Sequence, residues 1–354
     1  MKETGTISLD GSEGEGGGQV LRTALSLSLI SGRPFHLFRI RAHRSPPGLR
    51  PQHLACVRGA EAISDSSVRG AELDSQELWF TPGKVSSGDY VLDVGTAGAT
   101  TLVFQCLFYP LALAQGGTLR LKGGTHVSHS PSFHYLSQIW QVALRAYGLS
   151  ADFKLRSAGF YPRGGGDFEA SISPLGTAPD RVELPSRGTL GHVQVSSMVA
   201  DLPFHIAERQ GVAAAQALKE KGILCDVENL PLPTTGSPGS VVFIRAEFEN
   251  TLAGFCALGE KGKRAEEVGR EAASALSEFM STSGALDAHL ADQLLLPAAL
   301  LAAGSLGPSR FGTTVFTTQK VTGHLKTNAA IIERFLPINI QFEESGRVQI
   351  SPRA

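Results

Sequence analysis

The sequence is poor in cysteine, and its few cysteines are not arranged to bind a metal or to form a disulfide framework. The four cysteines, Cys56, Cys106, Cys225 and Cys256, form no Cys-x-x-Cys pair and stand among apolar neighbours. Closely spaced cysteines are the usual sign of a thiolate zinc site or of a small disulfide-stapled domain. We therefore expect these side chains to be core residues.

Long apolar runs are also missing. No stretch reaches the roughly 20 apolar residues that a transmembrane helix needs, and the polar start at residues 1–5 does not resemble a signal peptide. These features predict a cytoplasmic protein. The 354 residues, 42% hydrophobic and 18% charged, have the composition of a globular protein and the length for two domains.

The chain has almost no net charge, yet its basic residues are unevenly distributed. Lys and Arg number 32 against 33 Asp and Glu, but residues 33–58 contain no acidic residue. This stretch holds Arg33, Arg39, Arg41, Arg44, Arg50, Arg58, His36, His43 and His53. Such a cluster suits a phosphorylated ligand or a polyanion, and a solvated basic surface is the alternative. Gln52 and His53 would begin a helix, where backbone N–H groups favour an anion.

A glycine-rich stretch precedes the first predicted helix. Gly11-Ser-Glu-Gly-Glu-Gly-Gly-Gly18 leads into residues 19–30, whose apolar pattern predicts a buried helix. Glycine lets the backbone approach a ligand closely, and a helix N-terminus favours an anion. Gln19 and Arg22 would share one helical face near that end. An ordinary glycine-rich turn is the alternative.

Two common phosphate-binding motifs do not fit this stretch. A Walker motif needs a lysine followed by a hydroxyl residue, and the glycines at 17 and 18 are followed by Gln19. A dinucleotide fingerprint that begins at Gly14 would need glycine or alanine where Gln19 stands. Any anion site here must therefore be of another kind.

The predicted elements recur three times along the chain. Residues 19–81 read as helix, strand, helix and two strands, and the same order returns over 97–172 and from about 289 to 351. Residues 186–280 read as a separate segment between turn-rich flanks. We predict an α+β fold with three repeated α/β units in a large domain, residues 1–185 and 281–354. A smaller α+β domain, residues 186–280, would be inserted before the third unit.

The candidate for chemistry lies in residues 322–337. His324 follows a glycine just before an apolar helix, so its imidazole would lie at the end of an element beside open backbone. A lone histidine at such a place is equally suited to a structural or capping role. A zinc site formed by His126, His129 and His134 is a weaker alternative, because no cysteine or carboxylate pattern accompanies them.

Nearly the whole sequence resembles RNA 3′-terminal phosphate cyclases. The matching motifs are Leu9-Asp-Gly-Ser-Glu-Gly-Glu-Gly-Gly-Gly-Gln-Val-Leu-Arg22, Ile40-Arg-Ala42, Pro47-Gly-Leu-Arg-Pro-Gln-His-Leu54, Gly123-Gly-Thr125, Gly159-Phe-Tyr-Pro-Arg-Gly-Gly-Gly166, Leu290-Ala-Asp-Gln-Leu294 and residues 324–337. Their number, order and spacing make the resemblance specific. It implies three repeated units of two helices on a four-stranded sheet, with a smaller domain inserted before the third.

The resemblance also implies an activity. Members of this family are ligases that use ATP to convert an RNA 3′-phosphate end to a 2′,3′-cyclic phosphate and release AMP and pyrophosphate. The family histidine that matches His324 attacks the α-phosphorus of ATP and becomes linked to AMP. The RNA phosphate then accepts the AMP, and the neighbouring 2′-hydroxyl closes the ring. A neutral imidazole is a suitable nucleophile near neutral pH.

Further roles follow from the matching motifs. Glu15 would hold a divalent metal, Mg²⁺ or Mn²⁺, in keeping with the preference of Mg²⁺ for oxygen ligands. Phosphate groups of ATP or of the RNA end would be bound by Gln19, Arg22, Arg41, Arg44, Gln52 and His53. The nucleotide would be bound by Gln105, Pro131, Tyr135, His289, Leu290, Ala291, Asp292 and Gln293. Tyr135 and His289 depart from the phenylalanine and tyrosine common in the family, although both rings can stack on a base.

The expected partners are ATP and RNA 3′-phosphate ends, without a membrane or an obligate protein partner. Two other classes of protein stay open. A non-catalytic relative in RNA binding or ribosome assembly would share the fold but lack the nucleophile, and His324 with the intact residues 14–22 argues against it. A transferase for a small phosphorylated metabolite would share repeated α/β units without needing a nucleophilic histidine.

Overall fold

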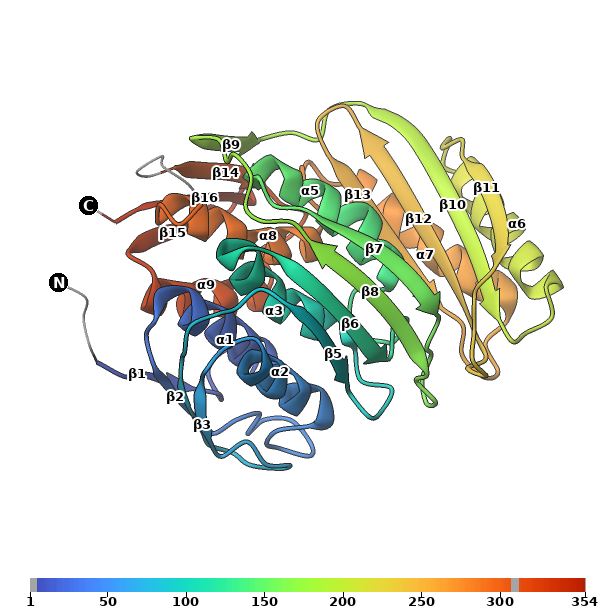
Figure 1. Cartoon of the computed structure of the whole chain (residues 1–354). Coiled ribbons are helices and arrows are strands. Elements are labelled where there is room, and N and C mark those ends of the chain that lie inside the picture. Colours follow the sequence, from blue (N-terminus) through green and yellow to red (C-terminus); the bar gives the residue numbers. More distant parts are fainter. Residues whose placement is uncertain (1–4, 307–311, 354) are drawn as a thin grey trace.

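The computed structural model describes residues 5–306 and 312–353, and it contains helices and four-stranded mixed sheets (Figure 1). This confirms the predicted α+β class. Residues 1–4, part of the polar start of the chain, lie outside the described residues. Within the described ranges, no helix combines the length and the apolarity that crossing a membrane would require.

The first sheet is formed by residues 7–81. Its strands are β1 (Ile7–Asp10), β2 (Phe35–Phe38), β3 (Ser67–Arg69) and β4 (Leu78–Thr81), in the order β1-β2-β4-β3. Phe35, Leu37, Leu78 and Phe80 alternate with exposed or half-buried residues and are almost completely buried. This period of two gives the sheet one apolar face, which packs against α1 (Gln19–Ser31). α2 (Pro51–Ala62) connects β2 to β3.

Two further sheets have the same order of strands. The second contains β5 (Asp89–Asp93), β6 (Gly117–Gly123), β7 (Ala151–Ser157) and β8 (Gly166–Ile172), ordered β5-β6-β8-β7. The third contains β9 (Arg181–Leu184), β14 (Thr313–Thr317), β15 (Ile338–Phe342) and β16 (Arg347–Pro352), ordered β9-β14-β16-β15. In each of the three sheets the first two strands are parallel and the other neighbours are antiparallel.

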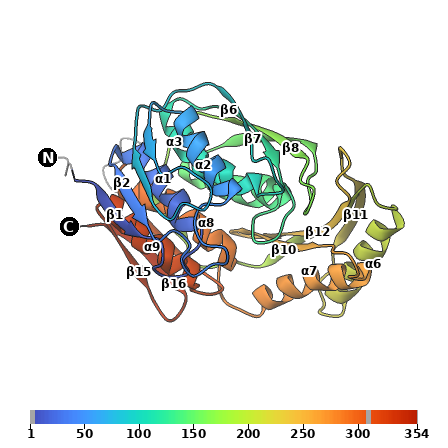
Figure 2. The same ribbon diagram turned by 90° about the horizontal axis from the view of Figure 1, so that it is seen from below.

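The helices of these sheets share one core. α1 packs against both α3 (Thr100–Ala114) and α9 (Gly323–Phe335), and α9 packs against α8 (Ala288–Ala302). Figure 2 shows these helices between the sheets. A further helical segment is interrupted by a π-helical turn and consists of α4 (Phe133–Tyr135), η1 (Leu136–Trp140), α5 (Gln141–Leu144) and η2 (Arg145–Tyr147). The helix N-termini that meet in this core are the scaffold of the site described below.

Residues 190–280 build a fourth sheet. Its elements are β10 (Leu190–Ala200), α6 (His205–Lys219), β11 (Asp226–Pro231), β12 (Gly239–Phe248), β13 (Leu252–Leu258) and α7 (Ala265–Met280), with the strands in the order β11-β10-β12-β13. Ile244, Leu276 and Phe279 belong to a separate apolar core between this sheet and its helices. Val241 and Phe243 belong to the main core instead. The sheet is therefore apolar on both faces, and one of them packs on the rest of the chain.

The position of this segment differs from the expectation. The sequence predicts it ahead of the third unit, but β9 precedes it and pairs in parallel with β14. Along the chain, the first strand of the third sheet therefore comes before residues 190–280, and the rest of that sheet follows after α8. Four residues of alternating exposure, Arg181 to Leu184, are too short a pattern to be recognised as a strand without their partner.

Candidate active site

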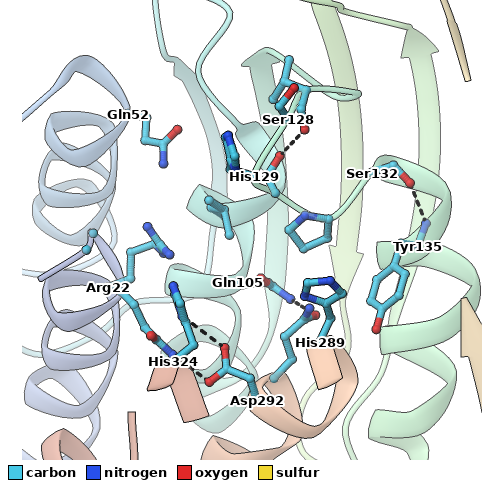
Figure 3. A pocket seen from close by; sticks show the side chains of 18 of the residues that line it. Arg22, Gln52, Gln105, Ser128, His129, Ser132, Tyr135, His289, Asp292 and His324 are labelled. Carbon is cyan, nitrogen blue, oxygen red and sulfur yellow. Dashed lines mark hydrogen bonds and ion pairs between the residues drawn. The ribbon is translucent and has the colours of Figure 1, made fainter. Parts of the chain in front are cut away.

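Several helices begin around one cleft of about 1140 Å³ (Figure 3). Gln19 is the first residue of α1, and Pro51 and Gly323 begin α2 and α9. The cleft is lined near these ends by Gln19, Arg22, Gln52, His53, His289, Asp292 and His324. Helix N-termini present free N–H groups and the positive end of the helix dipole. Their convergence makes the cleft suited to a polyanionic ligand.

The glycine-rich stretch is required by close packing at this point. A side chain at Gly18 would place its Cβ 2.2 Å from His53 Nε2. Gly14 has a φ of 62°, and a Cβ there would lie 2.1 Å from Thr327 Oγ1 on α9. Because only glycine tolerates both the conformation and the contact, the stretch can bring Glu15 beside α9.

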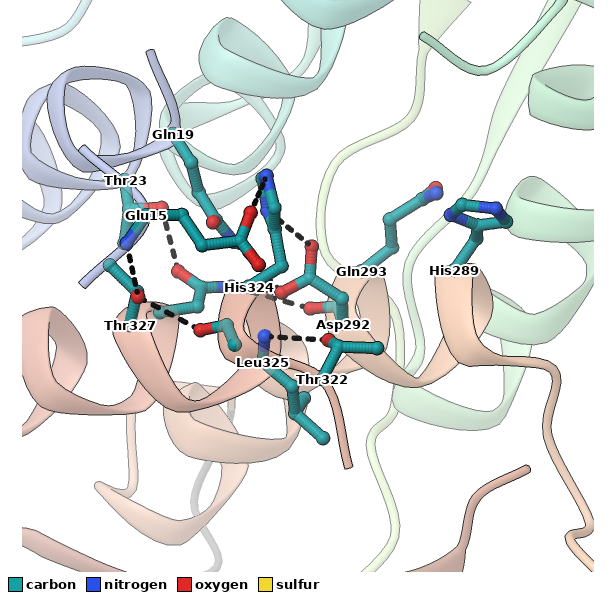
Figure 4. A network of polar contacts seen from close by, with 12 residues as sticks. Glu15, Gln19, Thr23, His289, Asp292, Gln293, Thr322, His324, Leu325 and Thr327 are labelled. Carbon is teal, nitrogen blue, oxygen red and sulfur yellow. Dashed lines mark hydrogen bonds and ion pairs between the residues drawn. The ribbon is translucent and has the colours of Figure 1, made fainter. Parts of the chain in front are cut away.

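His324 lies at the start of α9 between two carboxylates (Figure 4). Thr322 caps this helix, since its hydroxyl oxygen accepts a hydrogen bond of 3.0 Å from the Leu325 N–H. His324 Nε2 lies 3.3 Å from an oxygen of Glu15, and Nδ1 lies 3.8 Å from Oδ2 of Asp292. The imidazole is 42% exposed. It is thus held in one orientation while one edge stays open to the cleft.

Asp292 is fixed by neighbours from two other helices, α1 and α9. Its Oδ1 accepts a hydrogen bond of 2.8 Å from Gln19 Nε2 on α1 and one of 3.3 Å from Asn328 Nδ2 on α9. Asn328 in turn accepts a bond of 2.8 Å from the hydroxyl of Thr23. Sequence reasoning missed Thr23 and Asn328, whose roles arise from contacts between distant segments. This network leaves Asp292 Oδ2 to face His324.

The two carboxylates affect the charge of His324. Asp292 is the main cause that raises the pKa of His324 above its usual range, and Glu15 adds to it. Partial burial and the nearby Arg22 act in the opposite direction. At 3.8 Å the contact with Asp292 is electrostatic, longer than an ordinary hydrogen bond. Asp292 is therefore suited to stabilise a positive charge that develops on the ring.

A basic wall stands opposite the carboxylates. Arg22, Arg41, Arg44 and Arg50 all line the cleft. Arg44 Nη2 reaches the main-chain oxygen of Glu15 at 3.4 Å. Burial, followed by the charges of Arg22, Arg41 and Arg50, lowers the pKa of His53 to about 3. Charged arginines beside a neutral histidine give a wall of hydrogen-bond donors for phosphate.

The tautomer of His53 follows from its hydrogen bond. The backbone N–H of Arg50 donates to His53 Nδ1 at 3.0 Å, so this nitrogen carries no proton. The neutral ring then holds its proton on Nε2, which faces Gly18 at the beginning of α1. Gln52 is engaged differently, because its side-chain oxygen accepts a bond of 3.1 Å from the Ala99 N–H. Its amide nitrogen remains available to a ligand.

The residues expected to bind the nucleotide fall into two groups. Gln105, Pro131, Tyr135, His289 and Gln293 line the cleft, and Gln105 Nε2 donates to Gln293 Oε1 at 2.7 Å. Leu290 and Ala291 do not line it, and they are 1% and 0% exposed in the core beneath. Positions three and four residues apart share a helical face, so Asp292 and Gln293 lie on the same face of α8 as His289.

The side chain of Tyr135 is held in place by burial and by hydrogen bonds, unlike a ring that is free to stack on a base. It is 5% exposed, and its hydroxyl donates to the carboxylate of Asp287 at 3.1 and 3.2 Å. Asp287 also caps α8 by accepting from the N–H groups of His289 and Leu290, each at 2.9 Å. The tyrosine hydroxyl, which a phenylalanine would lack, therefore helps to fix the start of the helix that carries Asp292.

The zinc site considered from the sequence is not supported. His126 Nε2 and His134 Nδ1 are hydrogen-bonded to each other at 2.9 Å, and His126 Nδ1 is 2.8 Å from the Thr125 hydroxyl. His129 lies in the loop that lines the cleft. Over residues 5–306 and 312–353, no group of three or more His, Cys, Asp or Glu side chains is placed to hold a metal ion by itself.

The buried histidines predict a loss of stability in mild acid. Burial lowers the pKa of His134 to about 4, well below the 6.5 of an exposed histidine. The folded state resists protonation of His134, so its stabilising effect is complete above pH 6.5 and is lost as the pH falls towards 4. The free energy of unfolding should decrease by about 3 kcal/mol over this interval from His134 alone.

Urea denaturation at pH 7.5 and pH 5 tests this expectation. The variant His134→Phe should be less stable at pH 7.5, because His126 loses its partner, but its stability should depend less on pH. An unchanged pH dependence in this variant would contradict the assignment of the acid sensitivity to His134.

Residues 252–275 supply a wall of the cleft that sequence reasoning did not predict. Gly254, Cys256 and Leu258 of β13 line it, with Lys263 and Glu271 beyond them. Lys261, Lys263 and Arg264 precede α7 in the sequence, but basic residues at such a place are more often solvated surface than part of a site. Only the packing of β13 against α4 and η1 reveals that this strand faces the site.

Comparisons with known proteins identify the family of this chain. Residues 13–342 match the model of the family described as RNA 3′-terminal phosphate cyclase. The chain is 41% identical over 350 residues to an RNA 3′-terminal phosphate cyclase of Methylococcus capsulatus, covering 96% of this chain and 94% of that protein. It is 39% identical over 341 residues to the protein so named from Archaeoglobus fulgidus, covering 95% and 98%. The chain therefore belongs to the RNA 3′-terminal phosphate cyclase family of enzymes.

Proposed function

We propose that this protein converts an RNA 3′-phosphate end to a 2′,3′-cyclic phosphate in two chemical stages that use ATP. The observation that carries this proposal is the position of His324, half-exposed between Glu15 and Asp292 at the beginning of α9. A nucleophile in a cleft lined by arginines and helix N-termini is suited to attack a phosphate. A scaffold protein would not need this arrangement.

In the first stage, His324 Nε2 attacks the α-phosphorus of ATP. A P–N bond forms, the P–O bond to the leaving group breaks, and pyrophosphate departs. Nδ1 keeps its proton and directs it towards Asp292, whose carboxylate stabilises the positive charge on the ring. Covalent catalysis of this kind replaces one difficult condensation by two easier steps.

In the second stage, an oxygen of the RNA 3′-phosphate attacks the phosphorus of the histidine-linked AMP. The P–N bond breaks and a pyrophosphate bridge joins the AMP to the RNA. The 2′-hydroxyl then attacks the RNA phosphorus, AMP leaves, and the ring closes. Arg22, Arg41 and Arg44, with Gln19, Gln52 and His53, would hold the phosphates in line for these transfers.

The residues around His324 fit a divalent ion that binds together with the triphosphate. Mg²⁺ is often held by one or two carboxylates, with substrate phosphates and water as the other ligands. Glu15 is 40% exposed and reaches the cleft, so it would be the protein ligand, and Asp292 is engaged by Gln19 and Asn328. A bound Mg²⁺ or Mn²⁺ would neutralise charge on the phosphates.

The base of ATP would occupy the part of the cleft near Pro131, Tyr135 and His289, with Gln105 and Gln293 beside it. Leu290 and Ala291 would support this pocket from the core. We also propose that the three sheets of equal strand order, with their helices, are repeats of one unit. Residues 1–185 and 281–354 would form the catalytic domain, and residues 186–280 an inserted domain.

A substrate without the attacking hydroxyl separates the two stages. An RNA that ends in a 2′-deoxynucleotide 3′-phosphate should accept AMP and stop, because the acceptor in AMP transfer is the phosphate and the 2′-hydroxyl is needed only to close the ring. Denaturing electrophoresis should show an adenylated strand that accumulates, and no cyclic product. Steady release of AMP from this substrate without an adenylated strand would contradict the proposed sequence of steps.

A further inference from the structure

β13 is the edge strand of the fourth sheet, and its free edge borders the cleft. The order of the sheet is β11-β10-β12-β13, so β13 has a neighbour on one side only. Gly254, Phe255, Cys256 and Leu258 all line the cleft. The side chain of Phe255 is 8% exposed and belongs to the core beneath the sheet. Phe255 can therefore contribute little more than its main chain to the cleft wall.

The register determines which main-chain groups point into the cleft. The Phe248 N–H donates to the Thr251 oxygen and the Gly259 N–H to the Ser240 oxygen, each at 2.9 Å. Hydrogen-bonded pairs alternate with non-bonded pairs in an antiparallel ladder. Cys256 pairs with Phe243 and Leu258 with Val241, and both are non-bonded positions. Their N–H and C=O groups consequently point away from β12, towards the free edge.

Packing leaves only part of this edge accessible. At Gly254 the face of the sheet is tightly packed, since a Cβ there would lie 2.5 Å from Ile139 and 2.9 Å from the ring of Tyr135. The oxygen of Leu258 accepts a hydrogen bond of 3.2 Å from Lys263 Nζ. Cys256 is exposed. Beyond this packed position, the main-chain groups that face the free edge at the cleft are the Cys256 C=O and N–H and the Leu258 N–H.

Charge indicates which part of a nucleotide lies here. Beside β13 the cleft is lined by Glu260 and by Glu271, which is ion-paired with Lys263, so this wall carries no excess of positive charge. Arg22, Arg41, Arg44 and Arg50 line the cleft near α1 and α2. Figure 3 shows Arg22 and Gln52 on one side of the cleft and Ser132 and Tyr135, next to β13, on the other. The negatively charged polyphosphate would lie beside the arginines, so the neutral base is the part of the nucleotide that would reach β13.

We propose that the edge of β13 reads the base of ATP: the Cys256 C=O accepts from the 6-amino group of adenine, and the Leu258 N–H donates to N1. On an open strand edge, a C=O and the N–H two residues later lie side by side and match this adjacent donor and acceptor. Guanine presents the reverse pattern at the same positions. This inference rests on the proposed use of ATP and assigns to the inserted segment the choice of base.

An uncovered strand edge supports the assignment. Free N–H and C=O groups on a sheet edge invite pairing with another strand, and proteins usually cover them. Here Tyr135 and Ile139 pack on the face of the sheet at Gly254, and Lys263 occupies the Leu258 oxygen, which leaves the Cys256 C=O and N–H and the Leu258 N–H at the edge between them. A planar base of limited size would pair with this short opening, whereas a second strand would not.

ATP analogues test the inference without altering the protein. With 1-deaza-ATP the Leu258 N–H loses its acceptor, so the concentration for half-maximal labelling of the protein should rise roughly 3- to 10-fold. 7-deaza-ATP, altered on the other edge of the base, should behave as ATP does. Equal affinities for ATP and 1-deaza-ATP would overturn the inference. A 1-deaza effect confined to the terminal adenine of the RNA would overturn it too, because the edge would then read RNA.

A pair of proline variants tests the donor itself. Leu258→Pro removes the N–H that faces the cleft, and proline is tolerated where an edge-strand N–H makes no ladder bond. Leu252→Pro is the matched control, because Leu252 pairs with Glu247 at another non-bonded position and does not line the cleft. In Leu258→Pro the preference for ATP over 1-deaza-ATP should disappear, and in Leu252→Pro it should persist.

Calorimetric titration of the wild-type protein with both nucleotides keeps the two proposals separate. Binding of ATP without covalent labelling would contradict the proposed function, and the comparison with 1-deaza-ATP would still decide the role of β13. Should Leu258→Pro fail to fold, the analogue series alone gives the answer. Persistence of the preference in folded Leu258→Pro would exclude this N–H as the donor.

Discussion

His324→Ala is expected to form no cyclic phosphate from an RNA 3′-phosphate end. The variant lacks the nitrogen that would attack ATP, which lies between Glu15 and Asp292. Loss of the nucleophile in covalent catalysis should lower kcat by a factor on the order of 10⁴ or more. Electrophoresis of end-labelled RNA, with ATP and a divalent metal present, measures this directly.

The same variant should recover when the first stage is bypassed. An RNA supplied with AMP already joined to its 3′-phosphate needs only ring closure, in which His324 forms no bond. We expect His324→Ala to produce the cyclic end from this RNA. His192→Ala, an exposed residue beside Asp226 in the fourth sheet, should retain full activity on the ordinary substrate. Normal cyclisation by His324→Ala from a free 3′-phosphate would contradict the mechanism.

Arg22→Ala and Arg44→Ala should have the next largest effects. Both arginines line the cleft near Glu15 and His324, where phosphate groups would lie. Each lost charge-assisted hydrogen bond should cost roughly 1.5 to 3 kcal/mol in kcat/KM, or about 10- to 150-fold. Stability should change little, because these side chains face the cleft. Initial rates at limiting ATP and at limiting RNA identify the affected substrate.

Arg58→Ala is the matched control for this pair. Arg58 comes from the same basic stretch of the sequence, but it is exposed on α2 and does not line the cleft. Its replacement should leave kcat/KM unchanged. Equal losses in all three variants would indicate a diffuse electrostatic effect of the basic stretch, and the assignment of Arg22 and Arg44 to phosphate binding would be wrong.

Much of the fold could be predicted from periodicity. The alternation of buried and exposed residues identifies β6 and β8, and long apolar stretches identify α3 and α8. The first strand of each of the three sheets was not predictable, because β1, β5 and β9 span only four or five residues and owe their stability to a parallel partner. Each partner lies beyond a helix or, for β9, beyond the whole fourth sheet.

Site residues that stand in sequence motifs could be predicted. Residues such as Thr23 and Asn328, whose roles depend on contacts between distant segments, could not. His324, Glu15 and Asp292 stand in motifs of the sequence, and the structure brings their side chains together. Leu290 and Ala291 were also expected to bind the nucleotide, because they stand in the same motif as Asp292, although both are buried. Their apolar character was a usable signal, since apolar residues in a helix usually face the core.

The contribution of β13 was not accessible to sequence reasoning. Its proposed role rests on main-chain groups, which have no signature in the sequence. Their direction follows only from the register with β12 and from the position of β13 at the edge of the sheet. Motifs identify side chains that react, whereas pockets built from backbone require the assembled fold.

Incubation of the protein with ATP labelled at the α-phosphorus and a divalent metal, without RNA, tests the central claim most directly. After denaturing electrophoresis the protein should carry a label that is stable in base and labile in acid, as expected of a phosphoramidate. Peptide mapping should locate the label at His324, and His324→Ala should remain unlabelled. A label that survives in His324→Ala, or the absence of any label on the wild-type protein, would contradict the account.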